Sequence, residues 1–401
     1  MRVVLVADAY PPLRTSGAVQ LRDLARQFVL SGHEITVVVA SPELATNWTI
    51  EQLDGVQVLR LRTPKFKDVG YVRRTLGEFL MPFVMRSLLK KTPVAQERWD
   101  GVIWYSPSIF FGPLIKYLKR ENNCHAYLII RDIFPEWAAD MGLMGRGPVF
   151  QFFKWVANYQ YEQADTIGIQ SAGNAVYFDK WLTGPNRKLE VLHNWIGEAP
   201  LAECSIDLAK TGFAGRKIFV YAGNMGVAQN VAVFLELAIA TAAHDDMGFV
   251  FVGRGSEFER LRAIASEKNL SNVRFFPEIS PDEIPALYKQ CDAGLVALDT
   301  KHRTHNIPGK FLTYMQAGLP VLAKINPGND LEQLINSEAV GYCSTSDDVN
   351  TLQQQMADLI EDLNAEIDFR SRGQGLASRL FSSSAAVKQI ATALDSQSAQ
   401  H

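Results

Sequence analysis

The sequence contains little cysteine, and its four cysteines, Cys124, Cys204, Cys291 and Cys343, lie far apart in the chain. No two of them form a CxxC pair. Small secreted domains are held by closely spaced cysteines, and many structural zinc sites use CxxC pairs. The spacing therefore argues against a disulfide framework and against a zinc site, and it favours a reducing compartment.

Long apolar runs are also missing. A helix that crosses a bilayer needs about 18 to 20 consecutive apolar residues, and no stretch of this chain reaches that length. The N-terminal sequence MRVVLVADAYPPL has an apolar run of about five residues before Asp8 and two prolines, which predicts a buried strand and a loop, not a signal peptide. The net charge of −3 gives no overall attraction to nucleic acid or membrane. We expect a protein that is soluble or lies on a surface.

What the sequence does contain is an alternation of short apolar runs and helical patterns along its 401 residues. This length predicts two domains of about 200 residues each. The alternation predicts parallel sheets covered by helices, so the expected fold class is α/β with two tandem Rossmann-like, doubly wound domains. A polar, broken stretch after Gly197 separates a first domain at residues 1–197 from a second at residues 198–379.

Apolar runs mark the candidate strands. In the first domain they are residues 3–7, 34–39, 56–60, 101–104, 126–130 and 166–170, and in the second they are residues 217–221, 248–252, 273–276, 293–297 and 320–323. Ligands of open parallel sheets bind at the carboxyl ends of the strands. The loops after these runs are therefore expected to line a cleft that the two domains face.

The segment HNIPGKFLTYMQAGLPVLA, residues 305–323, predicts a loop, a helix, a tight turn and a buried strand. Pro308 and Gly309 shape the loop, Lys310 begins the helix and Gly318 ends it. A helix N-terminus that carries a lysine suits an anion. His305, in the preceding loop, is a candidate for contacts in the cleft.

Two glycine turns precede this segment in the second domain. In YAGNMGVAQN, Gly223 and Gly226 bracket Asn224, and backbone N–H groups at such a turn can form a concave anion site. Asn224 and Gln229 could hydrogen-bond sugar or phosphate oxygens, and Arg254 follows in VGRGSEFERL. The alternative is an ordinary connection between a strand and a helix.

The first domain has two polar loops of interest. Ser16 and Gly17 begin a helix after the first strand, where small residues let a ligand approach the backbone. In IRDIFPEW, Arg131, Asp132 and Glu136 follow a strand, and a carboxylate there could orient an acceptor hydroxyl or act as a base. A structural pairing of Arg131 with Asp132 is the alternative.

Residues 60–91 are strongly basic and interleaved with apolar and aromatic side chains. A basic helix with such a face suits a membrane surface, because cations attract anionic lipid and rings sit at the headgroup boundary. The alternative is a helix packed on the domain with a solvated basic face. Nucleic acid is not expected as a partner. The candidate membrane residues are Arg73, Arg74, Phe79, Phe83, Lys90 and Lys91.

Together, the SGA turn, the GN-x-G-x-A-Q turn, the VG-x-G turn and the PGK-x-L-x-YMQAGLPVLA segment resemble the retaining glycosyltransferases of family 4, which have the two-domain GT-B fold. The resemblance covers nearly the whole chain. A finer resemblance, through RDIFP, GNMGVAQ and HNIPGK, is to bacterial O-antigen and capsule enzymes of the L-fucosamine (N-acetyl-L-fucosamine) transferase type.

The resemblance implies transfer, with retention and without a metal or other cofactor, from a nucleoside-diphosphate sugar, expected to be a UDP-sugar. The acceptor would be a polyprenyl-diphosphate-linked glycan in O-antigen, lipopolysaccharide or capsule synthesis, at the cytoplasmic face of the inner membrane. Asp132 and Lys310 would be catalytic, and a C-terminal helix at about residues 380–395 would cross back to the first domain. Donor binding falls to Gly223, Asn224, Gly226, Gln229, Arg254, His305, Lys310 and Thr313, and acceptor binding to Ser16, Gly17, Arg131, Asp132 and Glu136.

The chain departs from the family pattern at two positions. Many relatives carry two glutamates eight residues apart, and here those positions hold His305 and Thr313. Thr313 can still form a hydrogen bond, but it carries no charge. The missing glutamates leave open a non-catalytic relative that binds a nucleotide or another transferase. A nucleotide-sugar epimerase on the same architecture is a second alternative.

Overall fold

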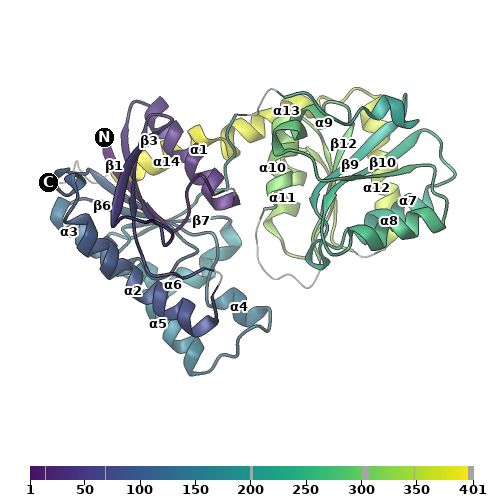
Figure 1. Cartoon of the computed structure of the whole chain (residues 1–401). Coiled ribbons are helices and arrows are strands. Elements are labelled where there is room, and N and C mark those ends of the chain that lie inside the picture. Colours follow the sequence, from purple (N-terminus) through teal and green to yellow (C-terminus); the bar gives the residue numbers. More distant parts are fainter. Residues whose placement is uncertain (14, 68, 199–201, 300–306, 347, 396–401) are drawn as a thin grey trace. The chain divides into compact units, whose positions relative to one another are not determined.

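The computed structural model describes residues 1–13, 15–67, 69–198, 202–299, 307–346 and 348–395. The chain forms two compact units (Figure 1). Unit 1 contains residues 1–197 and the C-terminal segment that begins at Ser383, and unit 2 contains residues 198–382. Each unit is built on one sheet covered by helices, which confirms the predicted α/β class with two Rossmann-like units.

Unit 1 has an eight-stranded sheet in the order β3-β4-β2-β1-β5-β6-β7-β8. The strands are β1 (Arg2–Ala7), β2 (Glu34–Ala40), β3 (Trp48–Leu53), β4 (Val56–Leu61), β5 (Gly101–Tyr105), β6 (His125–Ile129), β7 (Thr166–Ile169) and β8 (Lys188–Val191). Its central strands are continuous apolar runs, because helices cover both faces of a parallel sheet.

One strand of this sheet departs from the predicted parallel arrangement. β3 was not predicted, and it pairs antiparallel with β4 at the sheet edge. Asp54 and Gly55, which join the two strands, both have positive φ, at 52° and 80°. An Asp-Gly pair with this geometry forms a tight hairpin turn. The dipeptide was the signal that could have revealed β3.

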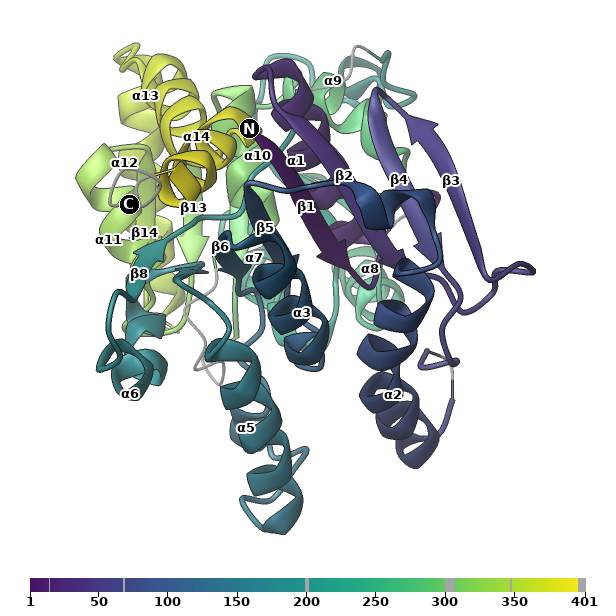
Figure 2. The same cartoon turned by 90° about the vertical axis from the view of Figure 1, so that its left-hand side faces the viewer.

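The helices of unit 1 are α1 (Ser16–Leu30), α2 (Tyr71–Leu89), α3 (Gly112–Asn122), α4 (Glu136–Asp140), α5 (Pro148–Tyr161), α6 (Asp179–Leu182) and α14 (Ser383–Asp395). On one sheet face the core includes residues of α2, α3 and α5 (Figure 2). On the other face it includes residues of α1 and α14. The chain thus leaves unit 1, builds unit 2, and returns to complete the core of unit 1.

Helix α14 is fixed to unit 1 by polar contacts as well as by burial. The Ser383 amide donates a hydrogen bond to the Ile196 carbonyl at 3.3 Å, and Gln389 Nε2 donates one to the Val191 carbonyl at 2.9 Å. Val387 and Ile390 are fully or almost fully buried against the sheet.

Unit 2 has a six-stranded parallel sheet in the order β11-β10-β9-β12-β13-β14. The strands are β9 (Lys217–Asn224), β10 (Met247–Arg254), β11 (Val273–Pro277), β12 (Ala293–Ala297), β13 (Val321–Lys324) and β14 (Gly341–Ser344). The helices are α7 (Ala232–Ala240), α8 (Phe258–Glu267), α9 (Ile284–Tyr288), α10 (Gly309–Ala317), α11 (Asp330–Glu338), α12 (Val349–Asn364) and α13 (Phe369–Leu376). The sequence did not lead us to β8 or β14.

Helix α10 has the boundaries that its sequence predicts. Pro308 is its N-cap, and Gly318 ends it in the left-handed conformation at φ 76°. A residue without a Cβ adopts that conformation at little cost. The buried strand β13 follows directly, as expected.

Candidate functional site

The glycine turn, which we define as residues 223–229, begins in the last two residues of β9 at the carboxyl edge of the unit 2 sheet. Gln229 closes this turn from within. Its Oε1 accepts hydrogen bonds from Asn224 Nδ2 at 3.1 Å and from the Gly226 amide at 3.0 Å. The Met225 amide donates to the Arg254 carbonyl at 2.7 Å. These two amides are therefore occupied within the protein, and the expected concave anion site does not include them.

The glycines of both predicted turns have a steric role. An added Cβ at Gly253 would lie 2.0 Å from the Gly223 carbonyl oxygen, and one at Gly255 would lie 2.4 Å from the Met225 carbonyl oxygen. Gly223, Gly253 and Gly255 all have positive φ, between 134° and 150°. The ends of β9 and β10 approach each other this closely because these positions carry no side chain.

Lys310 lies over the glycine turn. It is the second residue of α10, and its Nζ would be 3.7 Å from a Cβ added at Gly223. Nζ donates a hydrogen bond to the Tyr221 hydroxyl at 2.9 Å and lies 4.2 Å from the centroid of that ring. The structure thus brings together Lys310 and the turn, which are distant in sequence.

Tyr221 was missed by the sequence analysis, although it links the two parts of this site. Its hydroxyl accepts from Lys310 and donates to the Asn224 carbonyl at 2.7 Å. A buried tyrosine in an apolar strand usually needs a partner for its hydroxyl, and this was the available signal. Tyr314 anchors α10 to the same strand, since its hydroxyl donates to the Val220 carbonyl at 2.9 Å.

Burial sets the electrostatics of Lys310. Desolvation disfavours the ammonium form and lowers the pKa of Lys310 to about 8. An anion over the turn would restore the charged form. The arrangement is therefore a partly desolvated cation that gains by binding an anion.

The remaining predicted donor residues lie around this centre. Arg254, at the end of β10, is exposed, and its Nε lies 3.2 Å from a Glu278 carboxylate oxygen. Thr313 Oγ1 donates to the Lys310 carbonyl one turn back at 2.9 Å, so its hydroxyl is used within α10. His305 lies outside the described residues.

In unit 1, the carboxyl ends of β1, β5 and β6 bring a second set of predicted residues together. Ser16 begins α1 after its N-cap Thr15. An added Cβ at Gly17 would lie 3.3 Å from the Tyr105 ring. Burial raises the pKa of Tyr105, and Arg131 and Asp132 shift it in opposite directions, so both charges act on this ring. Tyr105, missed by sequence, is the common neighbour.

Arg131, predicted as an acceptor-binding residue, is buried and contacts the segment that follows β8. Its Nη1 donates to the Leu192 carbonyl at 3.0 Å, and its guanidinium lies 4.5 Å from the Trp195 ring centroid. Asp132 is exposed, and desolvation by its surroundings raises the pKa of its carboxyl group while Arg131 lowers it. Glu136, in contrast, is buried and pairs with Lys154 of α5.

The candidate membrane residues lie on α2 and just after it. Arg73 and Arg74 are exposed in its first turn, and Arg74 pairs with Glu78 at 3.1 Å. Phe79 and Phe83 are exposed, and their ring centroids are 5.9 Å apart. The exposed Lys90 lies 4.9 Å from the Tyr117 ring centroid, and Lys91 is exposed beside it. No helix among the described residues is both long and apolar enough to span a bilayer.

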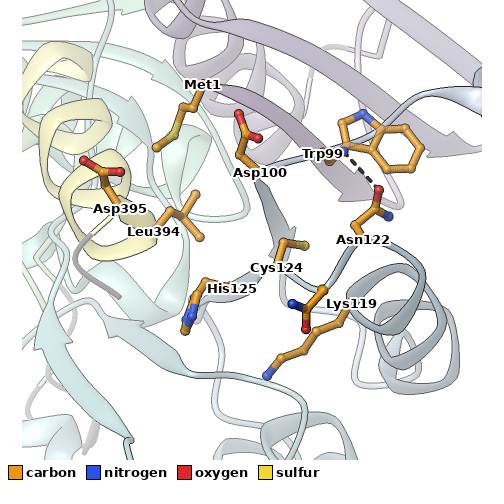
Figure 3. Close-up of a pocket in the computed structure, with 10 residues that line it drawn as sticks. Met1, Trp99, Asp100, Lys119, Asn122, Cys124, His125, Leu394 and Asp395 are labelled. Carbon is orange, nitrogen blue, oxygen red and sulfur yellow. Dashed lines mark hydrogen bonds between the residues drawn. The ribbon is translucent and has the colours of Figure 1, made fainter. Parts of the chain in front are cut away.

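A cavity of about 660 Å³ lies elsewhere in unit 1 (Figure 3). Its lining includes Met1, Asp100, Lys119, His125 and Leu394, so it opens at the amino ends of β1, β5 and β6 and beside α14. None of the predicted site residues lines it. Binding residues of open parallel sheets belong to the opposite edge, so we do not assign the reaction to this cavity.

Comparisons with known proteins agree on a class. Residues 206–375, nearly all of unit 2, match the family model described as "Glycosyl transferases group 1". WcaI of Escherichia coli (strain K12), assigned by its name to colanic acid biosynthesis as a glycosyl transferase, is 24% identical over 377 residues, which are 88% of this chain and 90% of that protein. These similarities support a glycosyltransferase.

Solved structures show the same fold. The structure of Anabaena Alr3699/HepE in complex with UDP has a TM-score of 0.67 and 17% identity, and the match covers 99% of this chain and 100% of that one. WaaG, a glycosyltransferase involved in lipopolysaccharide biosynthesis, has a TM-score of 0.62 and 13% identity, with 98% and 99% covered. The fold is therefore that of the GT-B glycosyltransferases, as the resemblance implied.

Proposed function

We propose that this protein transfers a sugar from a UDP-sugar to a polyprenyl-diphosphate-linked glycan in surface polysaccharide synthesis, with retention and without a metal. The observation that carries the proposal is the position of Lys310, whose partly desolvated ammonium lies over the glycine turn at a helix N-terminus. An anion of the size of a diphosphate suits such a site. The complex of HepE with UDP and the names of WcaI and WaaG support the same class of reaction.

The chemistry assigns a role to each charged group. Cleavage of the anomeric C–O bond leaves its electron pair on the diphosphate, and the Lys310 ammonium stabilises that charge. The acceptor hydroxyl forms the new C–O bond, and its proton passes to the departing phosphate on the same face, which retains the anomeric configuration. Asp132 orients the acceptor hydroxyl. We propose N-acetyl-L-fucosamine or a related N-acetylhexosamine as the sugar.

The proposed partners follow from this reaction. Unit 2 would hold the nucleotide sugar and unit 1 the lipid-linked glycan. A lipid-linked acceptor requires a peripheral contact with the membrane, at its cytoplasmic face. The basic helix α2 would contribute to that contact.

A thermal-shift series is the first test. We expect UDP to raise the melting temperature, GDP, ADP and CMP to raise it less, and magnesium to leave the UDP effect unchanged. Binding to the native state alone stabilises by mass action. A shift that requires magnesium would contradict a metal-independent site, and the absence of any shift would favour a non-catalytic relative.

Turnover tests the role of Lys310. In an assay of UDP-sugar consumption with a lipid-linked acceptor, Lys310→Ala should lower kcat/KM by the equivalent of about 2 to 4 kcal/mol of transition-state stabilisation. Lys268→Ala is the matched control, because Lys268 is exposed at the end of α8 and belongs to no predicted site, and it should have little effect. Unchanged kcat and kcat/KM for Lys310→Ala would make the lysine structural. Conversion of the donor without an acceptor would indicate an epimerase.

A further inference from the structure

Exposed apolar side chains are unevenly distributed over the described residues. Eleven of the eighteen large apolar side chains that are exposed there belong to two stretches of unit 1, residues 71–83 of α2 and residues 141–155 around the start of α5. Single exposed apolar residues are normal, but a concentration of this kind marks an interaction surface. The second stretch was not singled out from the sequence.

The first stretch is one face of α2. Its exposed apolar residues are Tyr71, Val72, Leu76, Phe79, Leu80 and Phe83. The opposite face is anchored in the core through Met81 and Met85, and an added Cβ at Gly77 would lie 2.6 Å from the Lys65 carbonyl oxygen. The inner face therefore packs α2 tightly on unit 1. The exposed apolar side chains of the outer face make no contribution to that packing.

The second stretch runs from the end of α4 into α5. Its exposed apolar residues are Met141, Leu143, Val149, Phe152 and Trp155. Trp155 is 62% exposed, and its ring stacks on Tyr159 with centroids 6.4 Å apart. Val156 and Ala157, on the inner face of α5, are buried. This helix, like α2, presents apolar side chains on both sides.

Both stretches lie at the same end of unit 1. The first stretch begins with α2, which follows β4, and the second connects α4, which follows β6, with the first half of α5. Helices that follow parallel strands begin at the carboxyl edge of the sheet. Figure 2 shows α2 and α5 extending past the strands on that side, with α3 between them. We call the exposed apolar residues of these two stretches, which α3 separates, the two projections.

Positive charge lies on the same helix as the first projection. Arg73 and Arg74 are exposed within the projection, and Arg86, Lys90 and Lys91 are exposed towards and just after the other end of α2, whereas the acidic residue of this helix is Glu78. Arg146 is exposed beside the second projection, paired with Asp140 at 2.9 Å. Cations next to exposed aromatic rings match the headgroup region of an anionic bilayer, where phosphate meets acyl chain.

We propose that unit 1 docks on an anionic lipid bilayer through these two projections, with the stretch at residues 141–155 inserting apolar side chains beside the basic helix. A flat bilayer can receive two separated projections at once, whereas a single peptide would need a continuous groove. The proposal deepens the peripheral membrane contact and, for its biological purpose, rests on the lipid-linked acceptor. Binding to lipid itself needs neither donor nor acceptor.

Trp155 provides a local reporter. The full chain is mixed with vesicles of phosphatidylethanolamine and phosphatidylglycerol that carry brominated acyl chains, and with vesicles of phosphatidylcholine alone as the neutral comparison. We expect binding to the anionic vesicles, with quenching of a tryptophan that is lost in Trp155→Phe. The other tryptophans are buried or half-buried, so quenching in Trp155→Phe as strong as in the unmodified chain would overturn insertion of Trp155.

Three variants separate the contributions. Arg73→Glu with Arg74→Glu should weaken binding to anionic vesicles by at least about 25-fold, since each cation near the surface contributes about a factor of five. Leu143→Ser should weaken binding and quenching. Leu30→Ser is the matched control, because Leu30 is 73% exposed and Leu143 is 71% exposed, but Leu30 ends α1 at the other edge of the sheet.

Equal losses for Leu143→Ser and Leu30→Ser would overturn the proposal, as would the failure of the unmodified chain to bind anionic vesicles. Circular dichroism of each variant shows that the fold is retained. The UDP thermal shift is measured on the same samples without lipid. Loss of vesicle binding with an intact UDP shift would remove the docking surface and leave the proposed transfer standing, whereas the reverse result would remove the transfer alone.

Discussion

At the scale of single residues, the pair Lys310 and Tyr221 defines the candidate donor site. Two features keep the ammonium in place: the hydroxyl of Tyr221, at 2.9 Å, and the face of its ring, at 4.2 Å. Both are weak compared with a carboxylate partner. Among the described residues the ammonium is thus positioned without a carboxylate partner, and this state suits an incoming diphosphate.

The pH dependence of UDP affinity should reflect this environment. The pKa of Lys310 is about 8 in the free protein, so the ammonium form is lost as pH rises through about 8. We expect the Kd for UDP to be constant below that pH and to rise above it, with proton uptake on binding, measured by calorimetry in buffers of different ionisation enthalpy. Lys310→Met should bind weakly with no such uptake.

The contribution of the same group to folding has the opposite sign. The pKa of Lys310 is lowered from its ordinary value of 10.5, so the unfolded chain holds more protons than the native protein between about 8 and 10.5. The contribution of Lys310 therefore increases the free energy of unfolding as pH rises through that window. Opposite slopes for stability and UDP affinity would distinguish Lys310 from a lysine paired with a carboxylate; parallel slopes would contradict the assigned environment.

Tyr221→Phe tests the positioning of the ammonium. The variant keeps the ring but removes the hydroxyl, and we expect the affinity for UDP to fall by about 5- to 10-fold, on the scale of one hydrogen bond. Tyr314→Phe is the matched control, because the Tyr314 hydroxyl donates to the Val220 carbonyl and not to Lys310. Similar losses of UDP affinity in the two variants would mean that Tyr221 acts only through stability.

At the scale of elements, the glycine turns hold the strand ends together. β9 and β10 pair in register up to Asn224 and Arg254, and Gly223 pairs with Gly253. The glycine turn was predicted to form an anion site with its backbone N–H groups, and at Gly253 and Gly255 an added Cβ would meet backbone atoms of that turn. Because Gly253 and Gly255 have no side chains, the two turns can pack closely on each other.

Gly253→Ala should therefore destabilise unit 2. The added Cβ would lie 2.0 Å from the Gly223 carbonyl oxygen, at a φ of 150° that favours glycine. We expect a loss of about 2 kcal/mol or more in denaturant unfolding, from overpacking and backbone strain together. Gly375→Ala, in α13 with no atom within 4 Å of its added Cβ, is the control and should be neutral or stabilising. A tolerated Gly253→Ala would show that the turns can separate.

At the scale of the whole molecule, the chain path makes the two units spectroscopically distinct. All seven tryptophans lie at or before Trp195, so all belong to unit 1. The proposed UDP site belongs to unit 2. Tryptophan fluorescence therefore reports on unit 1, which does not contain the proposed nucleotide site.

UDP should stabilise the two units unequally. We expect calorimetry to show an increase in the melting temperature of unit 2, and tryptophan fluorescence to show a smaller increase for unit 1, since a ligand stabilises the unit to which it binds. Guanosine diphosphate at equal concentration is the control for non-specific effects. A larger shift in the fluorescence transition would place the nucleotide in unit 1 and contradict the site at Lys310.

The sequence by itself determined the α/β class, the core strands and the boundaries of α10, because these depend on local pattern: apolar runs, a glycine that adopts positive φ, and a lysine at a helix start. Tertiary structure decided which of these residues meet. Tyr221 and Lys310 are 89 positions apart, and Gln229 turned out to use its oxygen inside the turn. Contacts between residues that are far apart in sequence depend on the tertiary fold, which local sequence patterns do not predict. The second apolar projection was missed for the same reason. Its sequence is typical of a core helix, and only the burial of each side chain shows that one of its apolar faces is exposed.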